Sequence, residues 1–196
     1  NIIEHAESQN YKILSPKSSE LNLLKYKDIE NFLTQNKPDL VIHAAGVVGG
    51  IEANINNPVK FLVENIQMGI NILTASRMKR VKNFINLSSS CMYPRNSEIP
   101  LSEDQILTGE LEPTNEGYAL AKISTTKLCE FINREDSSLS YKTVIPSNLY
   151  GKYDNFNKNS SHMIPGVISK IHRAKINNFQ SVDIWGDGLS RREFMY

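Results

Sequence analysis

The sequence predicts an α/β fold built on a doubly wound parallel sheet. Short apolar segments of strand length alternate with longer segments of helical periodicity, and the strand-like segments end in loops rich in small and polar residues. This alternation implies β-α-β units, whose crossover connections make neighbouring strands parallel. In such sheets ligands bind beyond the carboxyl ends of the strands. The loops that follow Leu14, His43, Leu87 and Ile145 are therefore expected to share one crevice.

Each element follows from a local pattern. Runs of apolar and β-branched residues between turn-forming residues predict strands, and apolar residues spaced three or four apart predict helices. Strands are expected at residues 11–14, 40–43, 83–87, 141–145 and 182–185. Helices are expected at 1–9 (the tail of one), 25–36, 58–80 with some breaks, 117–134 and 164–176. Residues 44–50 form a small-residue loop, and 94–116, rich in Pro, Asn, Ser and Glu, a long surface loop.

One element of a dinucleotide-binding fold is missing from the pattern. Such folds normally open with a strand and a Gly-rich turn that binds pyrophosphate at a helix N-terminus. No G-x-x-G-x-x-G sequence precedes residues 11–14, and residues 191–196 follow a predicted strand without a closing pattern. We therefore expect a Rossmann-like domain at residues 1–157 that lacks its first strand and Gly-rich loop, and the start of a smaller substrate-binding domain at residues 158–196.

Composition narrows the class of partner. A formal net charge of +1 gives no reason to expect nucleic acid. No apolar run reaches membrane-spanning length and no signal peptide is visible, so we expect no membrane partner and a cytoplasmic location. The two cysteines, Cys91 and Cys129, form neither a disulfide framework nor a metal-ligand spacing.

A Tyr-x-x-x-Lys sequence predicts carbonyl reduction by a nicotinamide. Tyr118 and Lys122, four residues apart on a predicted helix, face the same way. The Lys122 ammonium should lower the pKa of the Tyr118 phenol, and Ser89 should donate a hydrogen bond to the substrate carbonyl. The alternative is a tyrosine packed on its helix beside a solvated lysine. The serine-rich strand end at 88–90 favours the catalytic interpretation.

Cys91, two residues past Ser89, is not needed for reduction. Its thiolate could abstract a proton from a carbon next to a carbonyl if a partner acid protonates the opposite face. His162 is the candidate acid. Each also has a simpler interpretation: Cys91 as an inert buried hydrophobe and His162 as a loop histidine. Cys129 is assigned to packing.

The cofactor prediction depends on the loop after residues 11–14. An acidic residue there would bind the ribose 2′-hydroxyl of NAD, whereas a cation suits the 2′-phosphate of NADP. Lys17 lies in this loop, with no carboxylate before Glu20. The pattern favours NADP(H), with a solvated loop lysine as the alternative.

In these residues the chain resembles the GDP-4-keto-6-deoxymannose 3,5-epimerase/4-reductases, the GDP-L-fucose synthases of the extended short-chain dehydrogenase/reductase family. Ten short runs, in order along nearly the whole chain, carry the resemblance. They are residues 20–24 (ELNLL), 47–51 (VVGGI), 89–94 (SSCMYP), 111–116 (LEPTNE), 118–123 (YALAKI), 148–151 (NLYG), 154–156 (DNF), 161–165 (SHMIP), 185–188 (WGDG) and 192–194 (REF).

The resemblance implies NADPH-dependent 3,5-epimerisation and 4-reduction of GDP-4-keto-6-deoxy-D-mannose to GDP-L-fucose by a homodimer whose helices 58–80 and 117–134 form a shared bundle. The implied catalytic residues are Ser89, Tyr118 and Lys122 for reduction, and Cys91 and His162 for epimerisation. The implied cofactor-binding residues are Lys17, Leu21, Asn22, Leu23, Leu87, Ser88, Ser89, Ser90, Lys122, Pro146, Ser147, Asn148, Leu149 and His162. The implied substrate-binding residues are Lys170, Trp185 and Arg192.

Two departures from the family pattern bear on the site. Ser88 stands where the family usually has Gly, and is expected to crowd the nicotinamide pocket slightly. Lys170 stands where Arg is common, which keeps the charge but loses the bidentate fork. Two other functions are alternatives: C4 reduction alone of a related GDP-4-keto-deoxysugar such as a deoxyheptose, and an inactive truncated fragment that acts only as a binding module.

Overall fold

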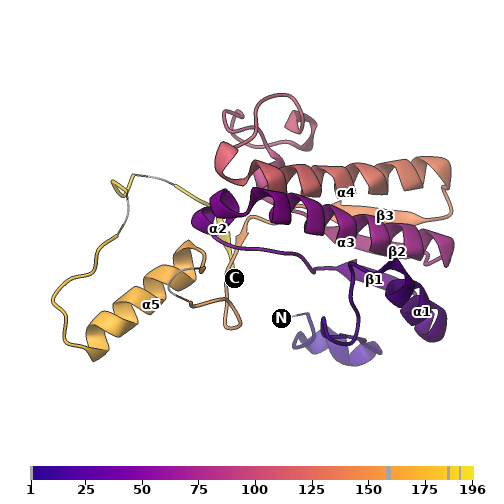
Figure 1. The fold of residues 1–196 in the computed structure, drawn as a ribbon, viewed down its shortest axis with the longest axis horizontal. Coiled ribbons are helices and arrows are strands. Elements are labelled where there is room, and N and C mark those ends of the chain that lie inside the picture. Colours follow the sequence, from indigo (N-terminus) through magenta and orange to yellow (C-terminus); the bar gives the residue numbers. More distant parts are fainter. Residues whose placement is uncertain (1, 158–159, 185, 190) are drawn as a thin grey trace.

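The computed structural model describes residues 2–157, 160–184, 186–189 and 191–196. Its centre is a three-stranded parallel sheet in the order β1-β2-β3, with His43 opposite Asn86 and Asn86 opposite Thr143 (Figure 1). The strands are β1 (Leu40–His43), β2 (Asn83–Leu87), β3 (Ser140–Val144), β4 (Asn148–Leu149) and β5 (Phe194–Met195). The α-helices are α1 (Tyr26–Asn36), α2 (Ile51–Asn56), α3 (Pro58–Met78), α4 (Glu116–Glu135) and α5 (Met163–Ile176). Short 3₁₀ helices are η1 (Ala6–Asn10), η2 (Ser90–Met92), η3 (Glu103–Gln105) and η4 (Pro113–Asn115).

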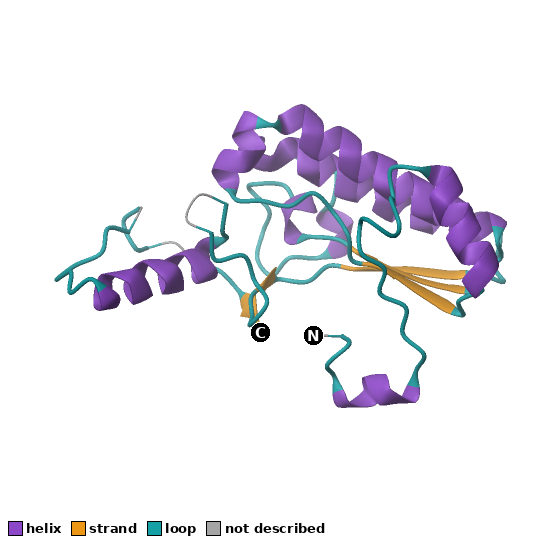
Figure 2. Ribbon diagram, turned by 60° about the horizontal axis from the view of Figure 1, so that its bottom comes forward, coloured by secondary structure: helices purple, strands orange, loops and turns teal. Residues whose placement is uncertain are grey.

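The helices α1, α3 and α4 lie over one face of this sheet (Figure 2). Apolar side chains that recur at helical spacing meet the side chains that alternate along the strands, which gives one buried core. Its members are Ile29, Leu33, Ile72, Leu73, Ala75, Val81, Phe84, Cys129, Ile132, Leu139 and Tyr141. On the other face, Leu40, Ile42 and Val144 are exposed. The parallel α/β architecture expected from the sequence is confirmed, but the described residues place these helices on one face of the sheet only.

Helices α3 and α4 run side by side and approach very closely at one point (Figure 1). A Cβ added to Gly69 of α3 would lie 2.1 Å from Thr125 Cγ2 of α4. At the amino-terminal end of α4, a Cβ on Gly117 would lie 2.9 Å from the Pro58 carbonyl oxygen. Two glycines therefore set the separation between α3 and α4, the helix that carries Tyr118 and Lys122.

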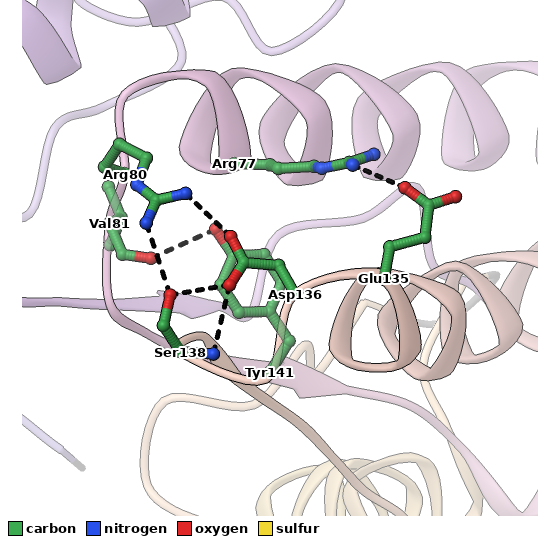
Figure 3. A network of polar contacts seen from close by, with 7 residues as sticks. All are labelled: Arg77, Arg80, Val81, Glu135, Asp136, Ser138 and Tyr141. Atoms are coloured by element: carbon green, nitrogen blue, oxygen red, sulfur yellow. Dashed lines mark hydrogen bonds and ion pairs between the residues drawn. The ribbon is translucent and has the colours of Figure 1, made fainter.

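Polar contacts join the opposite ends of the same helices, at the amino ends of the strands (Figure 3). Arg77 pairs with Glu135, and Arg80 Nη1 lies 2.7 Å from Asp136 Oδ2. Exposed pairs of this kind contribute little individually. The buried Tyr141 adds more, because its hydroxyl donates to the Val81 carbonyl at 3.1 Å and its ring stacks on Phe84. This end of the sheet is held by structural contacts, whereas the candidate catalytic residues occupy the opposite end.

Two predicted strands are wrong. Residues 11–14 form no ladder, and Tyr11 is 73% exposed. A strand needs a neighbour for its backbone N–H and C=O groups, and none of the described strands pairs with this segment. Residues 182–184 also form no strand, while residue 185 lies outside the described residues.

Other differences are local. Helix α2 was not expected, α3 is continuous, and the segment predicted as a helix tail at 1–9 contains η1. Residues near the end of the chain contact the segment after β3, because β5 pairs in parallel with β4 in a separate two-stranded sheet. Among the described residues, no helix combines the length and apolar character that a membrane span needs. The domain division at residue 157 stays a prediction.

Candidate active site

The turn that follows β2 carries two of the predicted catalytic residues. Ser89 is the N-cap of η2, and its Oγ accepts a hydrogen bond from the Cys91 backbone N–H at 3.5 Å. The hydroxyl and the thiol-bearing residue therefore lie in one tight turn at the carboxyl end of the central strand. This is the edge of a parallel sheet at which ligands bind.

Helix α4 brings Tyr118 and Lys122 to the same place. Lys122 is buried, and its Nζ donates to the Leu87 carbonyl at the end of β2 over 2.8 Å. The same Nζ lies 5.6 Å from the centroid of the Tyr118 ring. The ammonium thus lies between the strand end and the phenol, as the Tyr-x-x-x-Lys pattern predicts.

The pKa of Tyr118 moves in the direction opposite to the prediction. Burial raises the pKa of the phenol well above its ordinary value, and the nearby Cys91 thiol group raises it further. Burial also lowers the pKa of Lys122 and raises that of Cys91, where the Ser89 hydroxyl and the Lys122 ammonium oppose the rise. The expected lowering by Lys122 is not found, and desolvation is the largest cause of the shift in the Tyr118 pKa. Tyr118 is therefore held protonated at neutral pH, which suits a proton donor.

Phe61 of α3 supplies part of the apolar wall around Tyr118. Its ring meets the Tyr118 ring edge to face, with centroids 6.4 Å apart. A Cβ on Gly49 would lie 3.2 Å from Phe61 Cζ, so the loop after β1 packs behind this ring. Phe61 therefore links that loop to the phenol.

Three asparagines hold the loops of the crevice, and the sequence analysis missed all three. The Asn65 side chain accepts from Val47 N at 2.8 Å and donates to Val47 O at 3.0 Å, as a neighbouring strand would. Asn54 donates to the carbonyls of Gly49 and Gly50. Asn71 donates to the Leu23 carbonyl at 2.9 Å. The only sequence signal is the placement of asparagines on otherwise buried helix faces.

Comparison with known proteins agrees with this geometry. A model of the NAD dependent epimerase/dehydratase family matches residues 1–196. The chain belongs to this family. It is 61% identical over 196 residues to a GDP-L-colitose synthase of Yersinia pseudotuberculosis, covering 100% of this chain and 64% of that protein. A GDP-L-fucose synthase of Azorhizobium caulinodans is 48% identical over 196 residues, covering 100% of this chain and 62% of that protein.

A solved GDP-L-fucose synthetase from Naegleria fowleri, bound to NADP, is similar in structure. It superposes with a TM-score of 0.88 at 30% identity, covering 99% of this chain and 64% of that chain. The chain therefore spans less than two thirds of the length of these relatives.

The residues predicted on the adenosine side lie in two consecutive turns. The Lys17 backbone N–H donates to Glu20 Oε2 at 2.7 Å, so the Glu20 carboxylate lies against the backbone of Lys17, the residue predicted to bind the 2′-phosphate. Leu21 and Leu23 pack against the core, and Asn22 Oδ1 accepts from Leu24 N. On the nicotinamide side, Leu87 ends β2 and Ser88–Ser90 follow it, while residues 146–149 follow β3, with Asn148 and Leu149 in β4.

Ser88 makes contacts inside the protein. Its side chain is buried, and its Oγ donates to Met92 Sδ at 2.8 Å. Thr126 of α4 donates to the same Ser88 oxygen at 3.5 Å. The hydroxyl is thus directed toward Met92 and α4, and the slight crowding of the nicotinamide pocket by Ser88 stays a prediction.

The residues predicted after residue 157 are less closely associated with this centre. His162 is exposed at the N-cap of α5, next to Ser161, whose carbonyl oxygen would lie 3.2 Å from a Cβ on Gly50. No hydrogen bond between His162 and Cys91 occurs in the described part of the chain. Lys170 Nζ donates to the Asp183 carbonyl, and Arg192 Nη1 to the Arg191 carbonyl. Trp185 lies outside the described residues.

His43, at the carboxyl end of β1, gives the centre a pH-dependent stability. Burial, with the Lys122 ammonium as a second cause, lowers the pKa of His43 from 6.5 to about 4. The unfolded state therefore binds more protons between these two values, and the free energy of unfolding falls as the pH drops through that window. The depression corresponds to about 3 kcal/mol at the acid end.

We expect the His43→Leu variant to lose the part of the pH dependence of the free energy of unfolding that comes from His43. Urea unfolding across the same pH window should show a slope shallower than that of the unmodified chain, by about 3 kcal/mol in total. The matched control is His172→Leu at an exposed position of α5, which should leave the slope unchanged. Parallel slopes for the unmodified chain and His43→Leu would contradict a neutral, buried His43.

Proposed function

We propose that this chain carries the catalytic centre of an NADPH-dependent epimerase/reductase that converts GDP-4-keto-6-deoxy-D-mannose to GDP-L-fucose. The observation that carries the proposal is the gathering of Ser89, Cys91, Tyr118 and Lys122 at the carboxyl end of β2. The names of the relatives, GDP-L-colitose synthase and GDP-L-fucose synthase, support a GDP-sugar as the substrate.

The residues present fit the nicotinamide end of NADPH. The small-residue loop at 44–50 and the turns after β2 and β3 follow the strands of one parallel sheet, and Lys122 and Tyr118 stand between them. A Gly-rich turn for the pyrophosphate is not among the described residues. Bound NADPH would supply the hydride for reduction at C4.

In the reduction, Tyr118 donates the proton to the C4 oxygen. Its raised pKa keeps the phenol protonated until the developing alkoxide, a stronger base, accepts the proton. Ser89 donates a hydrogen bond to the same oxygen and stabilises its charge. Lys122, fixed by the Leu87 carbonyl, places a positive charge beside the tyrosinate that forms.

In the epimerisations, Cys91 removes the proton at C3 and at C5, and His162 returns a proton to the opposite face. Burial raises the pKa of the Cys91 thiol, and the Ser89 hydroxyl and the Lys122 ammonium oppose that rise and so favour the thiolate. His162 lies at the start of α5, next to the residue that contacts the Gly50 position. The proposal requires the α5 terminus to present His162 across the bound sugar from Cys91.

A second substrate is favoured by one observation, the 61% identity to a GDP-L-colitose synthase. L-Colitose is the 3-deoxy counterpart of L-fucose, so the two substrates differ at C3. Separate incubations of the chain with GDP-4-keto-6-deoxymannose and with its 3-deoxy counterpart, each with NADPH, would discriminate between them. NADPH oxidation with only the 3-deoxy sugar would replace the fucose proposal by the colitose one. Turnover of neither sugar, but of a GDP-4-keto-deoxyheptose, would indicate a reductase of that class.

Epimerisation is tested separately in deuterated water. We expect the unmodified chain to incorporate deuterium at C3 and C5 of the keto sugar, and Cys91→Ser to slow that incorporation by about 10²-fold or more, because a serine hydroxyl is a much poorer base precursor than a thiol. The control is Cys129→Ser, since Cys129 is buried in the core. Equal deuterium incorporation by Cys91→Ser and the unmodified chain would exclude Cys91 as the base.

The binding-module alternative makes a distinct prediction. An inactive fragment would bind NADPH or the GDP-sugar without turnover, whereas no NADPH binding at high micromolar concentration would exclude the enzyme proposal for this chain.

We further propose a homodimer in the cytoplasm, formed through α3 and α4. Apolar side chains on these helices support this interface, since Val59, Val63, Ile70, Leu120 and Phe131 are all exposed. Light scattering that gives the monomer mass would contradict it.

A further inference from the structure

The turn that carries Ser89 and Cys91 is closed at its base by a buried contact. Ser88, immediately before the turn, is 6% exposed, and Met92, the last residue of η2, is fully buried. Ser88 Oγ donates to Met92 Sδ over 2.8 Å. Within the turn, the contact from Cys91 N to Ser89 Oγ is long, at 3.5 Å. The ends of the turn are therefore held more firmly than its middle.

Helix α4 fastens the same two residues. Thr126 follows Lys122 by four positions, as Lys122 follows Tyr118, so the three share one face of the helix. Thr126 Oγ1 lies 3.5 Å from Ser88 Oγ and 3.6 Å from Met92 Sδ, within reach of both acceptors. One turn earlier, Lys122 Nζ binds the Leu87 carbonyl. A single helix face thus holds the end of β2 and both ends of the catalytic turn.

We propose that Ser88, Met92 and Thr126 are positioning residues that fix the Cys91 thiol beside Lys122 and Tyr118. The role of the thiol as a base rests on the proposed function, whereas the anchoring of the turn does not. The three side chains are buried, so each hydroxyl that loses its acceptor would be left without a partner inside the protein, at a cost in free energy. The conformation in which Ser88 and Met92, the two ends of the turn, keep their contacts is therefore lower in free energy than one in which the turn is loosened.

The Cys91 thiol itself reports on this anchoring. Thiol reactivity depends on access and on the thiolate fraction. The groups that act on the Cys91 thiol are the Ser89 hydroxyl and the Lys122 ammonium, and Tyr118 interacts with it electrostatically. Burial is the largest cause of its raised pKa. Loosening the turn admits water, so the thiol should become more reactive although it is less well placed as a base.

The test measures alkylation of Cys91 by iodoacetamide in a Cys129→Ala background, where Cys91 is the single thiol. The variants are Ser88→Ala, Met92→Leu and Thr126→Val, each of which removes a polar partner with little change in shape. Two matched controls remove buried hydroxyls that make none of these contacts. Ser76 Oγ has no hydrogen-bond partner within the described residues, and Thr125 Oγ1 binds only carbonyls of its own helix, so the controls are Ser76→Ala and Thr125→Val.

We expect each of the three variants to raise the alkylation rate near pH 8 by at least about fivefold, the scale of one ordinary hydrogen bond. The pH profile of alkylation should also shift toward the usual pKa of a thiol. Both controls, and Thr126→Ser, which keeps the hydroxyl, should behave as the unmodified chain. A smaller rise in all three variants, or an equal rise in the controls, would overturn the proposal. Because the assay uses neither NADPH nor sugar, its outcome is independent of the turnover and deuterium experiments that test the proposed function.

Discussion

The Tyr118→Phe variant is expected to lose C4 reduction, with kcat lowered by about 10²- to 10⁴-fold, the usual range for a removed general acid. In the proposed mechanism the phenol donates the proton, and its raised pKa keeps that proton present at neutral pH. The edge-to-face contact with Phe61 and the position over Lys122 need only the ring, which phenylalanine keeps. Folding and NADPH affinity should therefore be unchanged.

The measurement is NADPH oxidation in the presence of the GDP-4-keto sugar, together with a fluorescence titration of NADPH. Tyr26→Phe, at a more exposed position at the start of α1, is the control. Loss of NADPH binding together with turnover would show that Tyr118 holds the cofactor rather than donating the proton. Retention of more than about a tenth of the rate would exclude it as the general acid.

The second large effect is structural. A Gly69→Ala substitution places a Cβ 2.1 Å from Thr125 Cγ2, a distance at which one helix must move. Overpacking of this kind destabilises by about 1–3 kcal/mol, and at a contact this short the upper end is expected. Because α3 carries Asn65 and Phe61 while α4 carries Tyr118 and Lys122, separation of the helices should also weaken NADPH binding.

A second substitution tests the cause. Thr125→Ser removes Cγ2 but keeps the hydroxyl, so the nearest remaining Thr125 atom would lie 3.3 Å from the new Cβ. The double variant Gly69→Ala with Thr125→Ser should recover most of the lost stability in urea unfolding, measured against Thr125→Ser alone. If the stability losses of the two single variants simply add in the double variant, the contact between the helices is not the cause of the effect. Reduced flexibility of the unfolded chain cannot be the cause either, because it would stabilise the Gly69→Ala variant.

Much of the fold could be predicted from local patterns. The strands at 40–43 and 83–87 and the helix at 25–36 were placed within a residue of their observed bounds, because apolar periodicity and turn residues mark them. The segment 11–14 has an equally apolar sequence but is not a strand. Its state depends on a partner strand, and a single segment contains no information about its neighbour.

The candidate site shows the same division. The residues expected together were Ser89, Cys91, Tyr118 and Lys122, because a serine-rich strand end followed by Tyr-x-x-x-Lys suits one catalytic site. The structure brings them to the carboxyl end of β2. The direction of the Tyr118 pKa was not predictable from the Tyr-x-x-x-Lys spacing alone. It is set by burial, which depends on Phe61 from a different helix. Asn65 was missed because a polar residue on an apolar helix face has no local signature of what it binds.

The way Asn65 and Asn54 hold residues 44–50 has a consequence for how this loop can change. Within this loop, both side chains bind backbone groups, at Val47, Gly49 and Gly50. The path of the loop is therefore independent of the side chain at an exposed position such as Val48, which is 63% exposed. The side chain at such a position can therefore be exchanged while the loop keeps its course and the catalytic turn stays unchanged.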